Sequence, residues 1–261
     1  MKRIKKAFVA LAVFATIPSV AFADNVVVSK DTEFPTVNVS GASIDVLGIT
    51  PGMSSDAVKK IFADRSGKST EDYSVTSGFS YRSVTVTSQP YVVRSDIDNF
   101  GDNYEHLSAE FTSPATNSGI MYLDRSLRYS NPLTAPTFES VKGAILKKYG
   151  SPSSATEAPS SVDYTWAYGP RGKIANASYS AYDMAKSGNM CVSYANEGLY
   201  LVLTISVTKN ASDPSRAELM TVNMNDNLAC KVDGIAMTEQ LFTKATTIYD
   251  TQAKAGAGPA L

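Results

Sequence analysis

The chain has 261 residues, enough for one or two domains with a sizeable core. Four of its 24 basic residues lie within the first six positions. The rest of the chain has 20 basic and 25 acidic residues, and so an excess of five negative charges. This balance argues against nucleic acid or an anionic lipid surface as a partner, because both bind clustered Lys and Arg.

Residues 1–23 are typical of a secretory signal peptide. A positively charged start precedes the apolar run 7–20, and Ala21-Phe22-Ala23 then places small residues where a signal peptidase reads them. We expect cleavage before Asp24 and a periplasmic or secreted protein. The run is shorter than the roughly 20 apolar residues that a membrane-spanning helix needs, so we expect no integral membrane segment after cleavage.

The next part of the chain, residues 24–43, is rich in Val, Thr and Ser and contains Pro35, which favours an edge strand or an extended arm. Two later stretches, 54–62 and 137–150, resemble each other and predict short amphipathic helices. Each begins with an N-capping hydroxyl residue, Ser54 or Thr137, and has an acidic residue in its first turn.

Segments with β-type alternation follow each predicted helix. We therefore predict a β-rich α+β protein of two helix-on-antiparallel-sheet modules, residues 44–130 and 131–250. Their junction near residues 130–132 is either a linker or a loop within one continuous sheet. The predicted strands are Tyr73–Val75, Phe79–Tyr81, Val84–Val86, Tyr91–Val93, Val162–Tyr168, Cys191–Tyr194 and Leu199–Val207.

A further helix is predicted over Asp233–Tyr249, where apolar residues recur at helical intervals, and a disordered tail over residues 251–261. The two cysteines, Cys191 and Cys230, should form a disulfide in an oxidising compartment. Closing their loop of about 40 residues stabilises the fold by roughly 4 kcal/mol in the chain-entropy model.

Two short motifs carry a family resemblance. Residues Leu47–Ser54, followed by Val58, and Tyr149–Pro152, followed by Tyr164-Thr165-Trp166, resemble motifs of small exported bacterial modules. Those modules are of the SmpA/OmlA outer-membrane-assembly lipoprotein and tandem β-lactamase inhibitor protein type. The resemblance implies a helix-plus-antiparallel-sheet fold that presents a surface to another protein.

His106 is the single histidine, and any hydrolase hypothesis must use it. No serine lies in a G-x-S-x-G pentapeptide, and the sequence lacks a zinc-binding His pattern. The neighbouring acidic stretch Asp96–Glu105 partly matches a calcium loop, but Phe100 and Leu107 stand where oxygen ligands are needed. A solvated turn between strands explains the same residues without a metal.

Tyr164, Trp166 and Tyr168 should share one face of a strand, since side chains alternate along it. They form either the core under the second helix or an exposed face that recognises a protein or a glycan. We predict an exported bacterial binding protein without catalysis or cofactor, which engages another envelope or secreted protein. The alternative is a secreted hydrolase that uses His106 and the nearby acidic residues.

Overall fold

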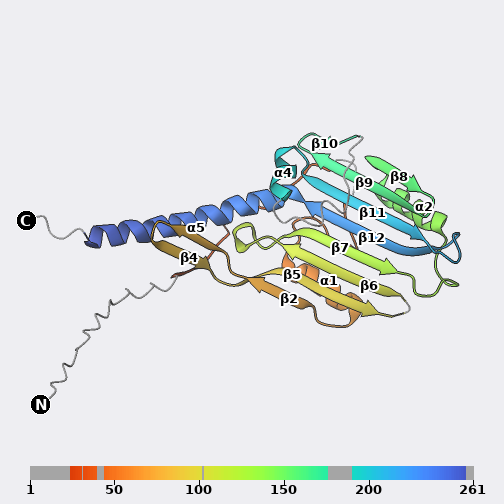
Figure 1. The fold of residues 1–261 in the computed structure, drawn as a ribbon, viewed down its shortest axis with the longest axis horizontal. Helices are drawn as coiled ribbons and strands as arrows, with labels where there is room; N and C mark the ends of the chain where they lie inside the picture. The colour runs from red at the N-terminus through yellow and green to blue at the C-terminus, as the bar shows by residue number, and fades with distance from the viewer. Residues whose placement is uncertain (1–23, 31, 40–43, 102, 176–189, 257–261) are drawn as a thin grey trace, which may run out of the picture.

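The computed structural model describes residues 24–30, 32–39, 44–101, 103–175 and 190–256 (Figure 1). The predicted signal peptide lies outside these residues. The protein is α+β and mostly sheet, as the sequence predicts. Its main body is a twisted sheet with two helices packed on one face, a short helix packed against one end of the other face, and a long helix that extends from one end of this body (Figure 1).

The main sheet has nine strands in the order β10-β9-β11-β12-β7-β6-β5-β2, with β8 also paired to β9. All of these pairings are antiparallel. The strands are β2 (Glu71–Val75), β5 (Tyr91–Phe100), β6 (Tyr104–Phe111), β7 (Ile120–Arg128), β8 (Ser154–Ala158), β9 (Ser161–Gly169), β10 (Gly172–Lys173), β11 (Leu201–Lys209) and β12 (Ala217–Asp226).

The two predicted amphipathic helices are α1 (Ser55–Ser66) and α2 (Phe138–Tyr149). Their N-caps are Ser54 and Thr137, whose side chains accept hydrogen bonds from backbone N–H groups of the first turn. Gly150 ends α2 with φ 71° and ψ −163°, a positive-φ conformation that glycine adopts without the steric penalty of a side chain. Both helices therefore begin directly after their predicted N-capping residues, and α2 ends at the predicted Gly150.

The helices bury residues four apart against the sheet, because such residues share one helical face. Val58 and Phe62 of α1 are completely buried, and Val141 and Ile145 of α2 are nearly so. They join the helix-facing side chains of the strands in one hydrophobic core. This packing fixes the sheet face that α1 and α2 cover.

The sheet is continuous across the predicted module boundary. Strand β7, from the first half, pairs with β12, from the second half, from Tyr122↔Asn225 to Arg128↔Leu219. Residues 130–132 are thus a loop within one continuous sheet. Each half contributes one helix followed by antiparallel strands.

A second, three-stranded sheet lies beside the main body. It contains β1 (Asp24–Val26), β3 (Gly78–Tyr81) and β4 (Val84–Ser88), with β1 parallel to β4. It packs along α5 (Asn227–Gly256), a helix about 45 Å long at 1.5 Å per residue (Figure 1). We call α5 and this sheet the arm. The sequence predicts an edge strand or an extended arm over residues 24–43, and among the described residues of that range only Asp24–Val26 forms a strand.

The C-terminal helix is longer than the sequence predicts. Residues 251–256, expected in a disordered tail, continue α5, and residues 257–261 lie outside the described part. Asp233 ties the helix to the main body: its carboxylate accepts hydrogen bonds from Ser113 N and Oγ and from Thr116 Oγ1 at 2.6 to 2.9 Å. These groups belong to the buried turn around the 3-10 helix η1 (Pro114–Thr116).

The predicted disulfide is confirmed: Cys191 and Cys230 are bonded, joining α4 (Met190–Asn196) to the first turns of α5. The predicted strand Cys191–Tyr194 is wrong, because these residues form α4. The apolar and polar residues alternate over too few positions to distinguish the two-residue repeat of a strand from the 3.6-residue repeat of a helix. In the helix, Cys191 and the buried Ala195 lie four residues apart on one face.

Loss of the disulfide should destabilise the protein. Its cysteines are 39 positions apart, so the double variant Cys191→Ser/Cys230→Ser should lose about 4 kcal/mol of unfolding free energy in the chain-entropy model. Urea unfolding with and without a reductant measures the loss. The reductant should weaken the wild type and leave the double variant unchanged, and an equal response of both would contradict the role assigned to this bond.

Asp226 caps α5 from a buried position. Its Oδ1 accepts a hydrogen bond from Ala229 N at 2.8 Å, while its Oδ2 has no partner among the described residues. Burial raises the pKa of Asp226 from 3.8 to about 7, although the backbone hydrogen bonds from Ala229 and Leu228 act in the opposite direction. The folded protein is therefore more stable when the Asp226 side chain is a neutral carboxyl group than when it is ionised.

This shift makes the stability depend on pH. Between pH 4 and 7 the folded chain keeps a proton that the unfolded chain releases, so the free energy of unfolding should fall as the pH rises. Asp226→Asn keeps a capping side chain without the charge. It should match the wild type near pH 3 and exceed its stability at pH 8 by at most about 4 kcal/mol.

Urea unfolding at a series of pH values tests this, with Asp64→Asn on the exposed surface of α1 as the control. Parallel curves for the wild type and Asp226→Asn would contradict the buried neutral carboxyl group.

Candidate functional site

The predicted aromatic face is part of the core. Tyr164, Trp166 and Tyr168 are 4%, 0% and 1% exposed, and they point towards the helices. The Trp166 ring lies 5.4 Å from that of Tyr149 on α2 and 5.9 Å from that of Tyr164, between ring centroids. The core interpretation of the alternation is correct. The alternative, an exposed binding face, is not formed, because α2 covers these side chains.

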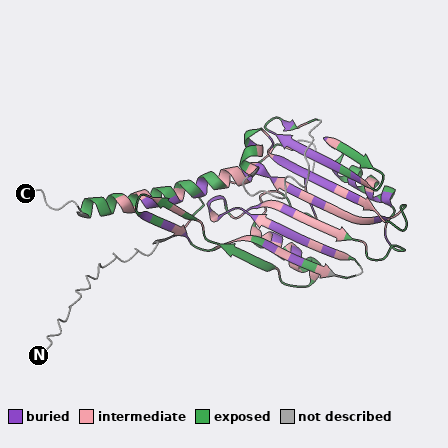
Figure 2. Ribbon diagram, viewed as in Figure 1, coloured by how far each residue is buried: buried purple, intermediate pink, exposed green. Residues whose placement is uncertain are grey.

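The opposite face of the main sheet has a different character. In Figure 1, α1 and α2 lie behind the sheet, and no described helix crosses β5, β6 and β7 on the near side. Figure 2 shows these strands as alternating buried and partly exposed residues. The side chains that point away from the helices are polar, aromatic or charged.

We call this surface the polar face. The strand register fixes its membership, because residues directly opposite each other share a face. Asp98 pairs with His106, His106 with Ser126, and Asp96 with Ser108. The polar face consists of Arg94, Asp96, Asp98, Tyr104, His106, Ser108, Glu110, Tyr122, Asp124, Ser126, Arg128, Thr221, Asn223 and Asn225, with the apolar Leu219 beside Arg128 at its edge.

His106 lies within this surface beside a carboxylate. Its Nδ1 is 2.9 Å from Asp98 Oδ1, and the Tyr104 hydroxyl donates to the same oxygen at 2.9 Å. Ser126 faces His106 from the neighbouring strand β7, so an acid, a histidine and a serine form a row across three strands. The sequence did not single out Ser126, because only the strand register brings it there.

This row lacks two features of a hydrolase triad. The Asp98 side chain is 46% exposed, whereas the acid of a triad is buried. Ser126 lies within a central strand whose backbone pairs with β6 on one side and β12 on the other. Its backbone N–H groups are engaged in the sheet, so they are not arranged as an oxyanion hole.

The acidic stretch Asp96–Glu105 is mainly strand. Asp96 and Asp98 lie in β5, and Asp96 pairs with Arg94 through contacts of 2.7 and 2.8 Å. Because side chains alternate along a strand, Ile97, which lies between them, points into the core. Asp96 and Asp98 therefore do not surround a single cation as the ligands of a calcium loop do. Among the described residues, no group of three or more His, Cys, Asp or Glu side chains could hold a metal ion.

The carboxylates of the polar face differ in their acidity. The hydrogen bond from His106 lowers the pKa of the exposed Asp98. Burial raises the pKa of Glu110 and of Asp124, and the charge of Arg94 partly opposes both shifts. The polar face therefore combines readily ionised groups at its edge with carboxyl groups that hold their protons more tightly at its centre.

Comparison with known proteins adds no relationship: no family model, curated protein or solved structure matches this chain. The resemblance of residues 47–54 and 149–152 to exported modules stays a prediction.

The opposite pKa shifts within one surface are directly measurable. Carboxyl-carbon NMR titration should give Asp98 a pKa below the ordinary aspartate value and Asp124 and Glu110 values above theirs. Arg94→Gln should raise the values of Asp124 and Glu110 further, since it removes a stabilising positive charge. Arg128→Gln is the matched control, because its guanidinium pairs with Glu218. Unchanged values in Arg94→Gln would refute the assigned electrostatics.

Proposed function

We propose that this is an exported bacterial binding protein without catalysis, and that its polar face engages another envelope or secreted protein. One observation carries the proposal: four neighbouring strands present a continuous set of polar and aromatic side chains on a sheet face without a described helix over it. Helix α4 packs on this side of the sheet only at β9 and β11, so the side chains on β5, β6 and β7 are available for contact.

The residue types of this surface fit protein recognition. Tyr122 and Arg128 are of the kinds that contribute most to protein interfaces, and the sheet holds their backbones rigidly. The polar face carries four acidic residues, Asp96, Asp98, Glu110 and Asp124, but only two arginines. A partner with a basic surface would be electrostatically complementary.

The disulfide supports an extracytoplasmic location, which the signal peptide predicts, because such bonds persist mainly in oxidising compartments. It fits a periplasmic or secreted protein. None of the helices that the structure describes is both long and apolar enough to cross a bilayer.

A combined variant tests the polar face. Asp98→Ala/His106→Ala/Arg128→Ala removes three of its side chains that reach solvent, with exposures of 46%, 29% and 56%. Chemical crosslinking in the envelope fraction and mass spectrometry identify the partner, and titration calorimetry then measures its affinity. The dissociation constant should rise at least about tenfold, equivalent to 1.4 kcal/mol or more.

The matched control is Lys60→Ala/Asp64→Ala, which removes an exposed ion pair from α1 on the other side of the sheet. Equal loss of affinity in both variants, or none in the polar-face variant, would refute the assigned surface. A hydrolase screen of the wild type and His106→Ala tests the alternative function. A hydrolytic activity that disappears with His106 would overturn a purely binding role.

A further inference from the structure

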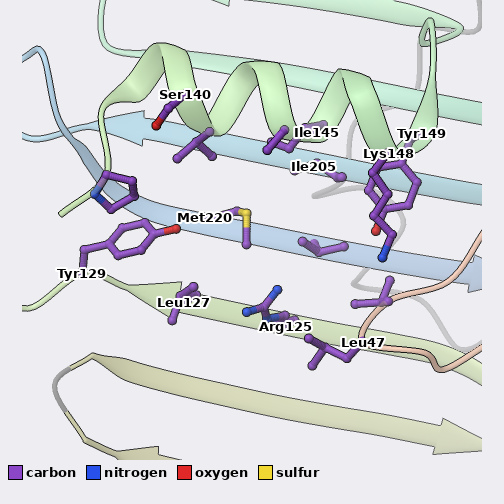
Figure 3. Close-up of a pocket in the computed structure, with 15 residues that line it drawn as sticks. Leu47, Arg125, Leu127, Tyr129, Ser140, Ile145, Lys148, Tyr149, Ile205 and Met220 are labelled. Carbon is purple, nitrogen blue, oxygen red and sulfur yellow. The ribbon is translucent and has the colours of Figure 1, made fainter.

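A cavity of about 440 Å³ lies on the helix-covered side of the main sheet, opposite the polar face. It is bounded by α2, by strands β7, β11 and β12, and by the loop at residues 46–47 (Figure 3). Its size is within the range of small-molecule sites. Most of its lining is apolar, with Leu47, Leu127, Ile145 and Met220 contributed by four different parts of the fold.

The cavity opens along one edge of α2. Ser140, Ala144 and Lys148 are four residues apart, line the cavity and are exposed, so they mark its rim. Lys148 Nζ lies 2.9 Å from Asp45 Oδ1, so its charge is already balanced at that rim. Lys148 therefore does not supply a free positive charge to the interior of the cavity.

Arg125 of β7 supplies that charge. Its side chain is 13% exposed and lies among the apolar lining residues (Figure 3). Its Nε donates to Glu105 Oε1 at 2.7 Å, whereas its two Nη groups bind no acceptor in the described part of the chain. A guanidinium thus lines an apolar cavity with donors to spare.

The charge of Arg125 is only partly compensated. Glu105, 5% exposed, also accepts hydrogen bonds from Arg65 of α1, at 2.5 Å from Nε and 3.0 Å from Nη2. Burial would raise the pKa of Glu105, but these arginines outweigh that effect and lower it, so the carboxylate is ionised. Two guanidinium groups share one carboxylate, which leaves one positive charge in excess beside the cavity.

We infer that this cavity binds an apolar monocarboxylic acid, such as a medium-chain fatty acid. The apolar lining would hold the hydrocarbon, and the free Nη donors of Arg125 would bind the carboxylate. A carboxylate matches the planar fork of a guanidinium and would neutralise the excess charge. This inference goes beyond the proposed function, since the cavity and the polar face lie on opposite sides of the sheet.

Titration calorimetry with decanoate and decanol at pH 7.5 tests the inference, because the two probes have the same chain length and differ in charge. Decanoate should bind at least about tenfold more tightly, as a charge-assisted hydrogen bond contributes more than a neutral one. Arg125→Gln should remove this preference while decanol still binds. Thermal unfolding verifies that the variant is folded.

The position of the site is tested without altering Arg125. Ala144→Phe places a large ring at the rim and should prevent binding of both probes. Leu146→Phe introduces the same ring on the same helix, at a position that does not line the cavity, and should leave both affinities unchanged. Absence of decanoate binding, equal affinity for the two probes, or full binding by Ala144→Phe would overturn the inference.

Discussion

The antiparallel pairing of β7 with β12 is the interaction on which the rest of the molecule depends. It joins strands from the two halves of the chain over seven residue pairs, from Tyr122↔Asn225 to Arg128↔Leu219. Without it, each half would be a small sheet with an open inner edge and an incomplete core. With it, side chains from both halves form a single hydrophobic cluster beneath α1 and α2.

The alternation of side chains along these strands separates two kinds of chemistry. On β7, Asp124 contributes to the polar face and the next residue, Arg125, lines the cavity on the opposite side. A shift of one residue in the register would exchange them, placing the polar set in the core. The register is therefore fixed by the same apolar contacts that make the fold stable.

Local signals in the sequence predicted the local structure well. The capping residues Ser54 and Thr137 and the terminating Gly150 act within a few neighbouring residues, so they identify α1 and α2 directly. The cysteine count was equally informative, because only one pairing is possible. The alternation at Tyr164–Tyr168 predicted that the three aromatic side chains share one face of a strand. Whether that face is buried depends on where α2 packs, and this is determined by the whole fold.

Other features depend on contacts between distant residues and could not be predicted in this way. Strands β3 and β4 were predicted by their alternation, but their separation into a second sheet follows from packing against α5, more than 140 residues later. Asp98, His106 and Ser126 come together only through the register of three strands. The excess charge at Arg125 likewise requires Arg65 to reach Glu105 from α1.

The way α5 is held has a mechanical consequence. The disulfide at Cys230 and the hydrogen bonds to Asp233 both act near its first turns, and most of its 30 residues extend beyond them. The 23 residues beyond Asp233 form a stiff rod of about 35 Å that works as a lever: a tilt of one degree at its base moves the tip by about 0.6 Å. Small displacements around η1 would thus be magnified into larger movements at the far end of the arm.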